Sequence, residues 1–500
     1  MKRRNASLSA RGILWMRSVA AELQTTWKWL CEEAELRNTN TLAWIALLTA
    51  IGATVRYCFL TQPMRYDEAF TFLNFVNRSV LHLFNYPSSN NHVLHTILVR
   101  MSVTVFGSHP ATIRLPAFCA GVCVIPLTFC LARLLTRNDR GGFLAGGLAA
   151  VFPYLILYDT MARGYSLIVL LSLCLAILTF RLITHPSTRL CVPVSLLTAL
   201  GLLTMPTFLF PAAGLLSWAL VMLLHRGHKP VWVLTHILMP CTILTTSVTG
   251  LFYTPTIILS DGIRSIVAND SVRSRPWSEF LSAIPKHFTQ TADCFARDIP
   301  AALVIGALLL LAAGLYALAR KGRWDACSLL PALVIGGAAV FLAKRAIPFE
   351  RTWIYILPFL FALADAGWVS IVKSTNLLVR SVLVLLTGGA AALLMYNNVI
   401  PSYPDTGHFP EASAVVNVLS DEMDPGDKVA ARCPADAPVF FYMWYRNVPY
   451  HKGGTDRAAA PKMFFVVKKS WYPLTDMTAQ NARKILDIGD AELYVLDRKD

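Results

Sequence analysis

Two adjacent carboxylates beside a cation give the sharpest chemical signal in this sequence. They lie in Arg65-Tyr66-Asp67-Glu68, shortly after the stretch 38–55, which holds no charged residue. Neighbouring carboxylates can supply a general base and the group that orients it, or they can bind a divalent cation. The structural alternative is that Asp67 caps a helix that begins at Ala69. The residues alone leave both interpretations open.

A second polar group follows about 20 residues later, at residues 88–95. Amide and imidazole side chains suit hydrogen bonding to a sugar or a phosphate. The side chains of this kind are Asn90, Asn91, His92 and His95. The two histidines are three residues apart and could bind a metal ion together, but such pairs are more often ordinary histidines at a membrane interface.

Two further clusters combine charge with aromatic or basic neighbours. Asp159 and Arg163 precede Tyr165, and their spacing of four also fits a simple ion pair at a helix end. The stretch 344–351 carries three cations, Lys344, Arg345 and Arg351, and a single acid. An arginine binds phosphate through two parallel hydrogen bonds, which favours a phosphate ligand here. The alternative is that these long side chains reach from a helix end toward water.

The elements that must position these groups follow from the composition. Of the 500 residues, 55% are hydrophobic and 15% are charged, whereas soluble proteins have about 25% charged residues. The mean hydropathy of +0.51 excludes a cytosolic enzyme, a disordered chain and a fibrous one. The net charge of +15 favours cytoplasmic loops and anionic lipid over nucleic acid. The 11 cysteines form no paired CxxC motifs, so no zinc site or disulfide framework is signalled, and no cofactor is indicated.

The sequence therefore predicts a polytopic α-helical membrane protein with about eleven transmembrane helices. A span needs about 20 mostly apolar residues, and only helices or closed barrels satisfy their backbone in lipid. The run 190–225 is long enough for two spans, with a break expected at Met205-Pro206. The uncharged runs are 38–55, 115–132, 141–158, 164–180, 190–225, 230–260, 299–319, 326–343, 352–364 and 381–404.

The basic residues predict the orientation of these spans. If the segment 92–106, which contains Arg100, is not a span, most short-loop cations fall on the side of the N-terminus, as expected for the cytoplasm. Residues 62–110 then form a long outer loop with helices that lie on the membrane. A second long outer loop, 254–298, is polar and could act as a lid or as a plain linker.

Three segments follow from this topology. Residues 1–37 form a basic amphipathic cytoplasmic segment, 38–397 form the membrane domain, and 398–500 form a small extracytoplasmic α/β domain. In that last domain we expect three strands, at 428–433, 462–469 and 491–498. We expect three helices there, at 411–423, 437–446 and 478–487.

Several stretches, taken in order, resemble the GT-C superfamily of glycosyltransferases. The closest type is family 39, with the protein O-mannosyltransferases, the lipid A aminoarabinose transferases and the Rgt-like bacterial enzymes. The similarity covers about residues 40–400. The stretches that carry it are Arg65–Ala69, Asn91–His95, Phe106–Pro116, Ala162–Ser166 and Pro348–Pro358.

This resemblance implies transfer of a sugar from a polyprenyl-phosphate donor to a lipid, glycan or protein acceptor. The reaction would take place on the outer face of a bacterial inner membrane and serve the cell envelope. Asp67 falls on the family's catalytic aspartate, with Glu68 as its neighbour, and Asp159 matches the second acidic position. Arg351 lies where the family has a basic residue suited to the lipid phosphate.

The chain departs from the family at Ser89-Asn90-Asn91-His92, where many relatives have a Lys-Pro or Pro-Pro pair. The usual lysine for the donor phosphate is therefore missing, and other cations are expected to replace it. The candidates are Arg100, Arg163, Lys344 and Arg345. The side chains expected to contact substrate are Arg65, Tyr66, Asn90, Asn91, His92, His95 and Tyr165.

Two alternatives to a glycosyltransferase remain. A transporter or flippase for lipid-linked or small polar substrates should carry ionisable residues at mid-membrane and paired broken helices, but the centres of these spans are nearly free of charge. A phosphotransferase acting on lipid head groups should need a metal cluster, which Asp67, Glu68 and His92 could supply.

Overall fold

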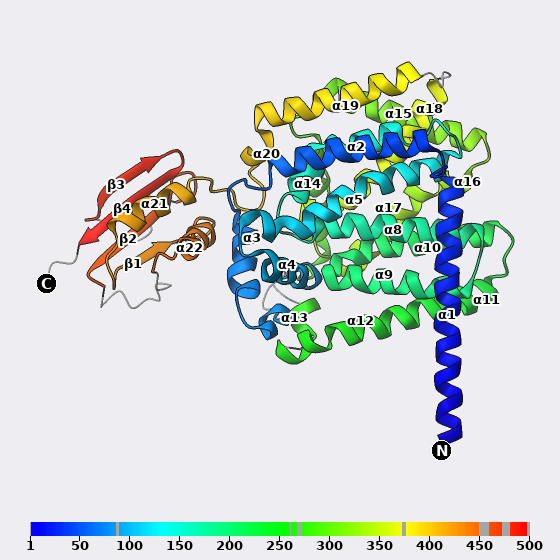
Figure 1. Cartoon of the computed structure of the whole chain (residues 1–500), viewed down its shortest axis with the longest axis horizontal. Helices are drawn as coiled ribbons and strands as arrows, with labels where there is room; N and C mark the ends of the chain where they lie inside the picture. The colour runs from blue at the N-terminus through cyan, green and yellow to red at the C-terminus, as the bar shows by residue number, and fades with distance from the viewer. Residues whose placement is uncertain are drawn as a thin grey trace.

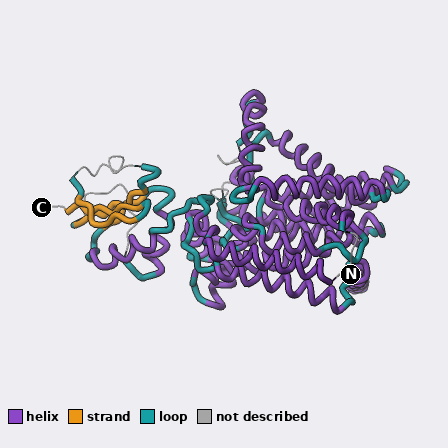
Figure 2. The backbone as a smooth tube through the Cα atoms, turned by 90° about the horizontal axis from the view of Figure 1, so that it is seen from above, coloured by secondary structure: helices purple, strands orange, loops and turns teal. Residues whose placement is uncertain are grey.

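The computed structural model is a bundle of roughly parallel helices with a small α/β unit beyond one end (Figure 1). It describes residues 2–86, 90–260, 262–267, 273–372, 377–449, 460–472 and 481–497, and the side chains from residue 17 onward. Figure 2 shows the same division, with the strands confined to the end opposite the N-terminus. The long helices of the bundle are α2 (Thr39–Cys58), α5 (Pro110–Thr136), α8 (Tyr165–Thr184), α9 (Cys191–Thr204), α10 (Leu209–His225), α12 (Met239–Leu259), α15 (Ala301–Arg320), α17 (Leu329–Lys344), α18 (Leu357–Ile371) and α19 (Leu377–Asn397).

Nine helices among the described residues are long and apolar enough to cross a membrane, and the protein is an integral membrane protein. A shorter apolar helix, Thr188–Thr204, lies where a tenth span is expected. The eleventh expected span is divided into α6 (Phe143–Val151) and α7 (Pro153–Asp159), because Pro153 has no amide hydrogen with which to continue α6. The expected break before Pro206 is present, since α9 ends at Thr204.

Short helical segments connect or extend these spans. They are η3 (Thr188–Leu190), η4 (Pro206–Phe208), α11 (Pro230–Val233), η5 (Leu234–Leu238), α16 (Trp324–Cys327), η7 (Glu350–Ile356) and α20 (Val399–Ser402). Of these, η7 is a 3-10 helix that leads directly into α18. The long outer loop expected at 62–110 contains α3 (Tyr66–Thr71), the π-helical turn η1 (Phe72–Val76), η2 (Val80–Phe84) and α4 (Val93–Phe106).

Two helices run across the bundle axis, one at each end. Figure 1 shows α4 end-on beside α3, and α1 (Lys2–Glu33) at right angles to the bundle at the far end. Trp29 of α1 lies 6.2 Å from the ring of Phe180, and the Arg181 guanidinium lies 5.4 Å from the Trp29 ring. These contacts attach α1 to the end of α8, as expected for a helix that lies along a membrane surface.

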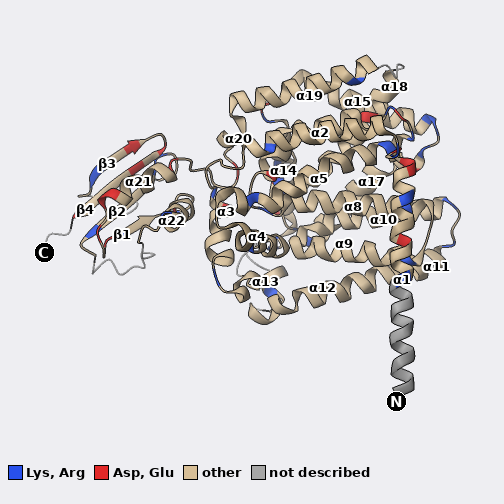
Figure 3. Cartoon of the chain, viewed as in Figure 1, with Lys and Arg blue, Asp and Glu red and all other residues tan. Residues whose placement is uncertain are grey.

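Charged side chains gather at the ends of the bundle and in the α/β unit (Figure 3). At the α1 end, Asp325 is surrounded by Arg137, Arg226 and Arg323, whose nearest nitrogens are 3.9, 3.8 and 2.9 Å from its carboxylate. These three short-loop cations thus lie together at the α1 end. That this end faces the cytoplasm stays a prediction from the charge bias.

The α/β unit contains a four-stranded sheet in the order β1-β2-β4-β3. Strands β1 (Lys428–Ala431) and β2 (Lys462–Lys468) are parallel, and β4 (Ala491–Asp497) is antiparallel to both β2 and β3 (Arg483–Ile488). Helices α21 (Ala412–Glu422) and α22 (Asp436–Tyr445) pack beside it.

One predicted helix of this unit, at 478–487, is wrong in its described part. Residues 483–488 form β3, whose hairpin with β4 turns through Gly489-Asp490, with Gly489 at a φ of 54°. A two-residue Gly-Asp connection is a hairpin signal, and it outweighs the helical spacing of the apolar residues before it. Residues 478–480 lie outside the described part of the chain.

The α/β unit is attached to the outer loop through α22. The Phe72 ring lies 5.4 Å from that of Phe441 and 4.8 Å from that of Trp444, and the Tyr442 hydroxyl accepts the Met64 N–H at 3.1 Å. Aromatic rings at these distances stabilise an interface beyond their buried area. The unit is therefore fixed beside α3, which begins at Tyr66.

The second outer loop, expected at 254–298, is largely helical in its described part. It holds the end of α12, the short α13 (Arg264–Val267) and α14 (Trp277–Ala296), a 20-residue amphipathic helix. Phe280, His287 and Thr291 form the buried face of α14. Their spacing of seven and four is that of one helix face.

Candidate active site at the end of the bundle

A cavity of about 370 Å³ opens at the end of the bundle that carries the α/β unit. Elements from six parts of the chain meet there: α3, three residues between η2 and α4, the start of α8, the break between α9 and α10, α13, and η7 with the residues before it. Most of its wall is apolar or aromatic. The lining residues are Tyr66, Asp67, Phe70, Tyr86, Asn90, His92, Arg163, Tyr165, Met205, Pro206, Thr207, Ile266, Pro348, Phe349, Arg351 and Thr352.

Asp67 is the carboxylate of this cavity. It lies in the first turn of α3, and its backbone N–H donates to the carbonyl of Thr406 at 3.3 Å. Its Oδ2 is 3.3 Å from Nη2 of Arg351 and 3.9 Å from Nη2 of Arg163. The helix begins at Tyr66, so Asp67 does not cap a helix that starts at Ala69.

Arg351 reaches the cavity from η7, 284 residues further along the chain than Asp67. Its Nε donates to the Tyr165 hydroxyl at 2.7 Å, and its guanidinium lies 4.3 Å from the centre of the Phe349 ring. One edge of the guanidinium is thus held by Tyr165, while Nη2 faces Asp67. This orientation presents N–H donors to the cavity.

Arg163 enters from the turn before α8. Its Nη1 donates to the carbonyl of Asn90 at 2.8 Å and to Oγ1 of Thr71 at 3.0 Å. Its Nε is buried and has no hydrogen-bond partner among the described residues. Nη2 lies 3.2 Å from Nε2 of His92.

His92 is kept neutral by its surroundings. Its Nδ1 accepts the N–H of Gly164 at 2.9 Å, so the ring cannot carry protons on both nitrogens. Burial, together with the nearby Arg163, lowers the pKa of His92 well below its usual value. His92 therefore adds no positive charge, and among the described residues that line the cavity there are two cations and one carboxylate.

Glu68 does not belong to the cavity, which corrects the expectation of a catalytic pair. Its side chain is fully buried and forms a two-point ion pair with Arg114 of α5, through Nε at 3.0 Å and through Nη2. The carboxylate also accepts the backbone N–H groups of Arg65 and Ala162, both at 2.9 Å. With both oxygens occupied, Glu68 holds α3, α5 and the turn before α8 together.

Asp159 is likewise held away from the cavity, contrary to its predicted catalytic role. It pairs with Arg56 of α2 rather than with Arg163, and Arg56 Nε donates to its Oδ2 at 2.9 Å. Gly121 of α5 makes room for this carboxylate, because a Cβ there would lie 2.1 Å from the Asp159 Cγ. The pair joins the end of α2 to the end of α7.

Three predicted phosphate ligands do not line the cavity. Arg100 donates to the carbonyl of Val76 at 2.6 Å, and Arg345 lies over the Trp277 ring at 5.4 Å. Lys344 is the last residue of α17, and its carbonyl accepts the Ser274 hydroxyl at 2.8 Å. Of the predicted cations, Arg351 and Arg163 are brought to the cavity.

The predicted substrate contacts divide in the same way. Tyr66, Asn90, His92 and Tyr165 line the cavity. Arg65, Asn91 and His95 are buried outside its wall.

The buried members of this group support the wall. Arg65 donates to the carbonyls of Ile400, Tyr403 and Asp405, and burial lowers its pKa to about 10. Asn91 donates to the carbonyl of Asn85 at 2.7 Å. Arg65 therefore ties the outer loop to the connection between α19 and the α/β unit.

Arg56 and Arg114, the arginines that neutralise Asp159 and Glu68, were not among the predicted site residues. Both lie inside largely apolar helices, where a charged side chain is costly unless it has a partner. That cost was the available signal for an ion pair, although it does not identify the partner. Among the described residues, no group of three His, Cys, Asp or Glu side chains is placed to hold a metal ion, so Asp67, Glu68 and His92 do not form the cluster considered above.

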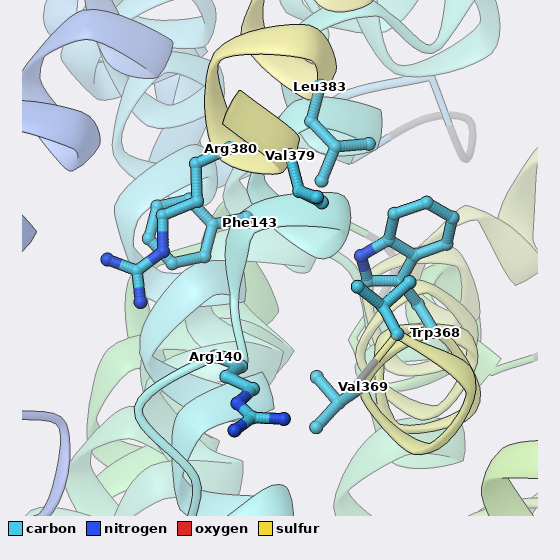
Figure 4. A pocket seen from close by; sticks show the side chains of 8 residues that line it. Arg140, Phe143, Trp368, Val369, Val379, Arg380 and Leu383 are labelled. Carbon is cyan, nitrogen blue, oxygen red and sulfur yellow. The ribbon is translucent and has the colours of Figure 1, made fainter. Parts of the chain in front are cut away.

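A second cavity lies at the opposite end, between α6, α18 and α19 (Figure 4). Its volume is about 20 Å³, which is room for about one water molecule. Arg140 and Arg380 border it, and the Arg380 guanidinium lies 4.6 Å from the centre of the Phe143 ring. It is too small for a sugar or a lipid head group.

The fold is similar to that of ArnT from Cupriavidus metallidurans. The apo structure of ArnT aligns with a TM-score of 0.61 and 12% identity, over 91% of this chain and 98% of that one. The structure of the same protein bound to undecaprenyl phosphate aligns with a TM-score of 0.57 and 12% identity, with the same coverage. No curated protein matches the sequence.

The family model described as the TgpA N-terminal domain matches residues 190–443, just over half of the chain. The match includes α9 to α21, most of α22 and Arg351, but it does not reach Asp67 and Arg163 on the N-terminal side. The chain therefore belongs to the family of the TgpA N-terminal domain, and its fold is similar to that of ArnT.

Proposed function

We propose that this protein is a membrane glycosyltransferase that transfers a sugar from a polyprenyl-phosphate donor to an acceptor at the outer end of the bundle. The observation that carries the proposal is the position of Asp67 between Arg351 and Arg163 in a cavity of about 370 Å³. The acceptor is a lipid, a glycan or a protein of the cell envelope, and the membrane is the inner membrane of a bacterium.

The donor is assigned from the cations and the fold. Two guanidinium groups are suited to a phosphate, because each can offer two N–H donors in a plane. The wall of Tyr66, Tyr165 and Phe349 suits a sugar and the start of an isoprenoid chain. The similar fold of ArnT, which has been solved with undecaprenyl phosphate bound, supports a lipid phosphate as the ligand.

In the proposed reaction Asp67 is the general base. Its carboxylate lies 3.3 Å from Arg351, and a phosphate that binds this guanidinium competes with Asp67 and releases it. Asp67 then takes the proton of the acceptor hydroxyl while the hydroxyl oxygen forms a bond to the anomeric carbon. The bond from that carbon to the phosphate oxygen breaks, and the electron pair leaves with the polyprenyl phosphate.

General base catalysis by Asp67 and charge stabilisation by the two arginines are expected to contribute similar factors to the rate. A positioned general base contributes a factor of roughly 10²–10⁴ to the rate. Arg351 and Arg163 stabilise the negative charge that grows on the leaving phosphate, and a preorganised donor of this kind contributes a factor of about 10²–10³.

The test is transfer of a radiolabelled sugar by the purified protein in detergent or liposomes. The donors are a panel of pentose- and hexose-linked polyprenyl phosphates, and the acceptors are a lipid and glycan extract of the native membrane. We expect wild-type protein to form a labelled glycoside, and Asp67→Asn to lower the rate at least a hundredfold. Asp293→Asn, a change at an exposed carboxylate on α14, is the matched control and should retain full activity.

Two results would contradict the proposal. The first is transfer of sugar by Asp67→Asn at the wild-type rate, which would show that Asp67 is not the general base. Alternatively, liposomes with wild-type protein could move labelled lipid across the bilayer without forming any new glycosidic bond, as expected for a flippase.

A further inference from the structure

The short helix η7, which carries Arg351, is also linked to α14. The Trp353 Nε1–H donates to Nε2 of His287 at 2.8 Å. The carboxylate of Glu350 lies 3.8 Å from Nδ1 of the same histidine. One imidazole of α14 thus faces residues on both sides of Arg351 in the chain.

The chemistry of these groups fixes the direction of the hydrogen bond. An indole nitrogen can only donate, so Nε2 of His287 must be the acceptor and Nδ1 carries the proton. The His287 side chain is 1% exposed, and its Nδ1 has no hydrogen-bond partner among the described residues. His287 therefore acts on η7 as a buried acceptor for Trp353, with its remaining N–H toward Glu350.

Aromatic packing surrounds this hydrogen bond. The Trp353 ring lies 4.9 Å from that of Phe210 on α10, and the His287 ring lies 6.1 Å from that of Phe341 on α17. Non-directional packing holds the indole between α10 and α17, whereas the hydrogen bond sets the rotation of the indole about its own axis. That rotation is coupled to the backbone of η7, two residues from Arg351.

We infer that His287 is a positioning residue for Arg351, and that α14 thereby fixes the direction in which the Arg351 guanidinium points in the donor-phosphate site. The inference rests on the proposed function. On the cavity side, Arg351 is held by Tyr165 and faces Asp67. In addition, the hydrogen bond from Trp353 to His287 keeps η7 from turning, so that Nη2 stays directed at the cavity.

The kinetic test compares two substitutions of similar size. His287→Gln places a carbonyl oxygen near the position of Nε2 and keeps an acceptor for Trp353, whereas His287→Leu removes the acceptor and keeps the apolar volume. For His287→Leu we expect KM for the polyprenyl-phosphate donor to rise about fivefold, the factor expected for one neutral hydrogen bond. Its kcat should fall as well, because a misaligned Arg351 also stabilises the departing phosphate less in the transition state.

The controls separate positioning from general damage. His287→Gln should keep KM within about twofold of wild type, and so should Gln290→Ala, which changes an exposed residue of the same helix. Trp353→Phe removes the donor of the same hydrogen bond, so its KM should rise about fivefold as well. This variant tests the inference independently if His287→Leu does not fold. An unchanged KM in Trp353→Phe, or equal KM values in the Gln and Leu variants, overturns the inference.

A spectroscopic readout tests the contact without turnover. The indole N–H resonance of Trp353, assigned by its loss in Trp353→Phe, should have the shift of a hydrogen-bonded group in wild type and in His287→Gln. It should move in His287→Leu. If it does not move, the inference fails whether or not the protein transfers sugar. If it moves as expected but wild-type protein transfers no sugar from any donor, the failure belongs to the proposed function.

Discussion

Asp67 and Glu68 follow each other in the first turn of α3, but their carboxylates enter two different regions of the molecule. Asp67 lies in the open cavity, where the nearest guanidinium nitrogens are 3.3 and 3.9 Å away. Glu68 lies in a closed network, where Arg114 and two backbone N–H groups occupy both of its oxygens. Both side chains are carboxylates and the two residues are adjacent in the chain, but the number of close donors differs.

This contrast separates a reacting carboxylate from a supporting one. A buried carboxylate whose oxygens are all paired cannot approach a substrate without leaving a charge unpaired, which is costly. A carboxylate with long contacts beside a cavity can exchange its partner for a ligand at little cost. Asp159, paired with Arg56, belongs to the closed type.

The largest expected difference between the two regions is in stability. Glu68→Gln leaves the buried Arg114 without its counter-ion, so we expect a loss of about 3–5 kcal/mol in the free energy of unfolding. Asp67→Asn, at a partly exposed site, should change it by less than about 0.5 kcal/mol. Denaturant unfolding in mild detergent measures both.

The double variant sharpens this comparison. Replacing Arg114 by Met in the Glu68→Gln background removes the unpaired charge, so part of the lost stability should return. Equal stability of the Asp67→Asn and Glu68→Gln single variants would show that the two regions do not differ as described.

The second expected effect separates cations that line the cavity from those that do not. Arg351→Lys keeps the charge but loses the planar donors that contact Tyr165 and Asp67, so KM for the lipid donor should rise about tenfold. Arg345→Lys, on the chain segment that joins α17 to η7, should leave KM unchanged. Steady-state kinetics with varied donor distinguish the two, and a rise of similar size in Arg345→Lys would favour the sequence-based assignment of Arg345 to the phosphate.

The smallest expected effect concerns pH and the support behind the cavity. Burial, with Arg163 nearby, lowers the pKa of His95 to about 3, whereas an unfolded histidine has a pKa of about 6.5. Between these values the unfolded chain binds a proton that the folded chain does not, so stability falls as the pH drops below about 6.5.

The protonation of His95 can change the free energy of unfolding by at most about 1.4 kcal/mol per pH unit. Thermal unfolding of wild type and of His95→Leu at pH 7 and pH 5.5 measures this contribution of His95. The variant should lose less stability than wild type over this interval, and an equal loss would mean that His95 is not kept neutral by the fold.

The sequence allowed the fold class and part of the site to be predicted because these depend on local signals. Uncharged runs of about 20 residues gave the spans, and Pro206 marked a break between two of them. Asp67 and Arg351 were identified from their own short motifs, although they are 284 residues apart. That they meet in one cavity depends on how the helices pack, and the order of short motifs does not fix that geometry.

What could not be predicted is which charged groups pair with each other. Glu68 was expected to share the role of Asp67, because the sequence does not show that Arg114, 46 residues further on, occupies its carboxylate. Asp159 was given a similar role for the same reason, since its partner Arg56 lies 103 residues away. In both cases a long-range ion pair holds the carboxylate away from the cavity, and the local sequence does not reveal the partner.

The most direct test of the central claim is an experimental structure of the protein with a polyprenyl phosphate bound. We predict that the phosphate oxygens lie within hydrogen-bonding distance, about 2.7–3.2 Å, of both Arg351 and Arg163. Asp67 should then be released from Arg351 and face the space left for the acceptor. A phosphate bound instead at Lys344 and Arg345, or at the opposite end of the bundle, would contradict the account.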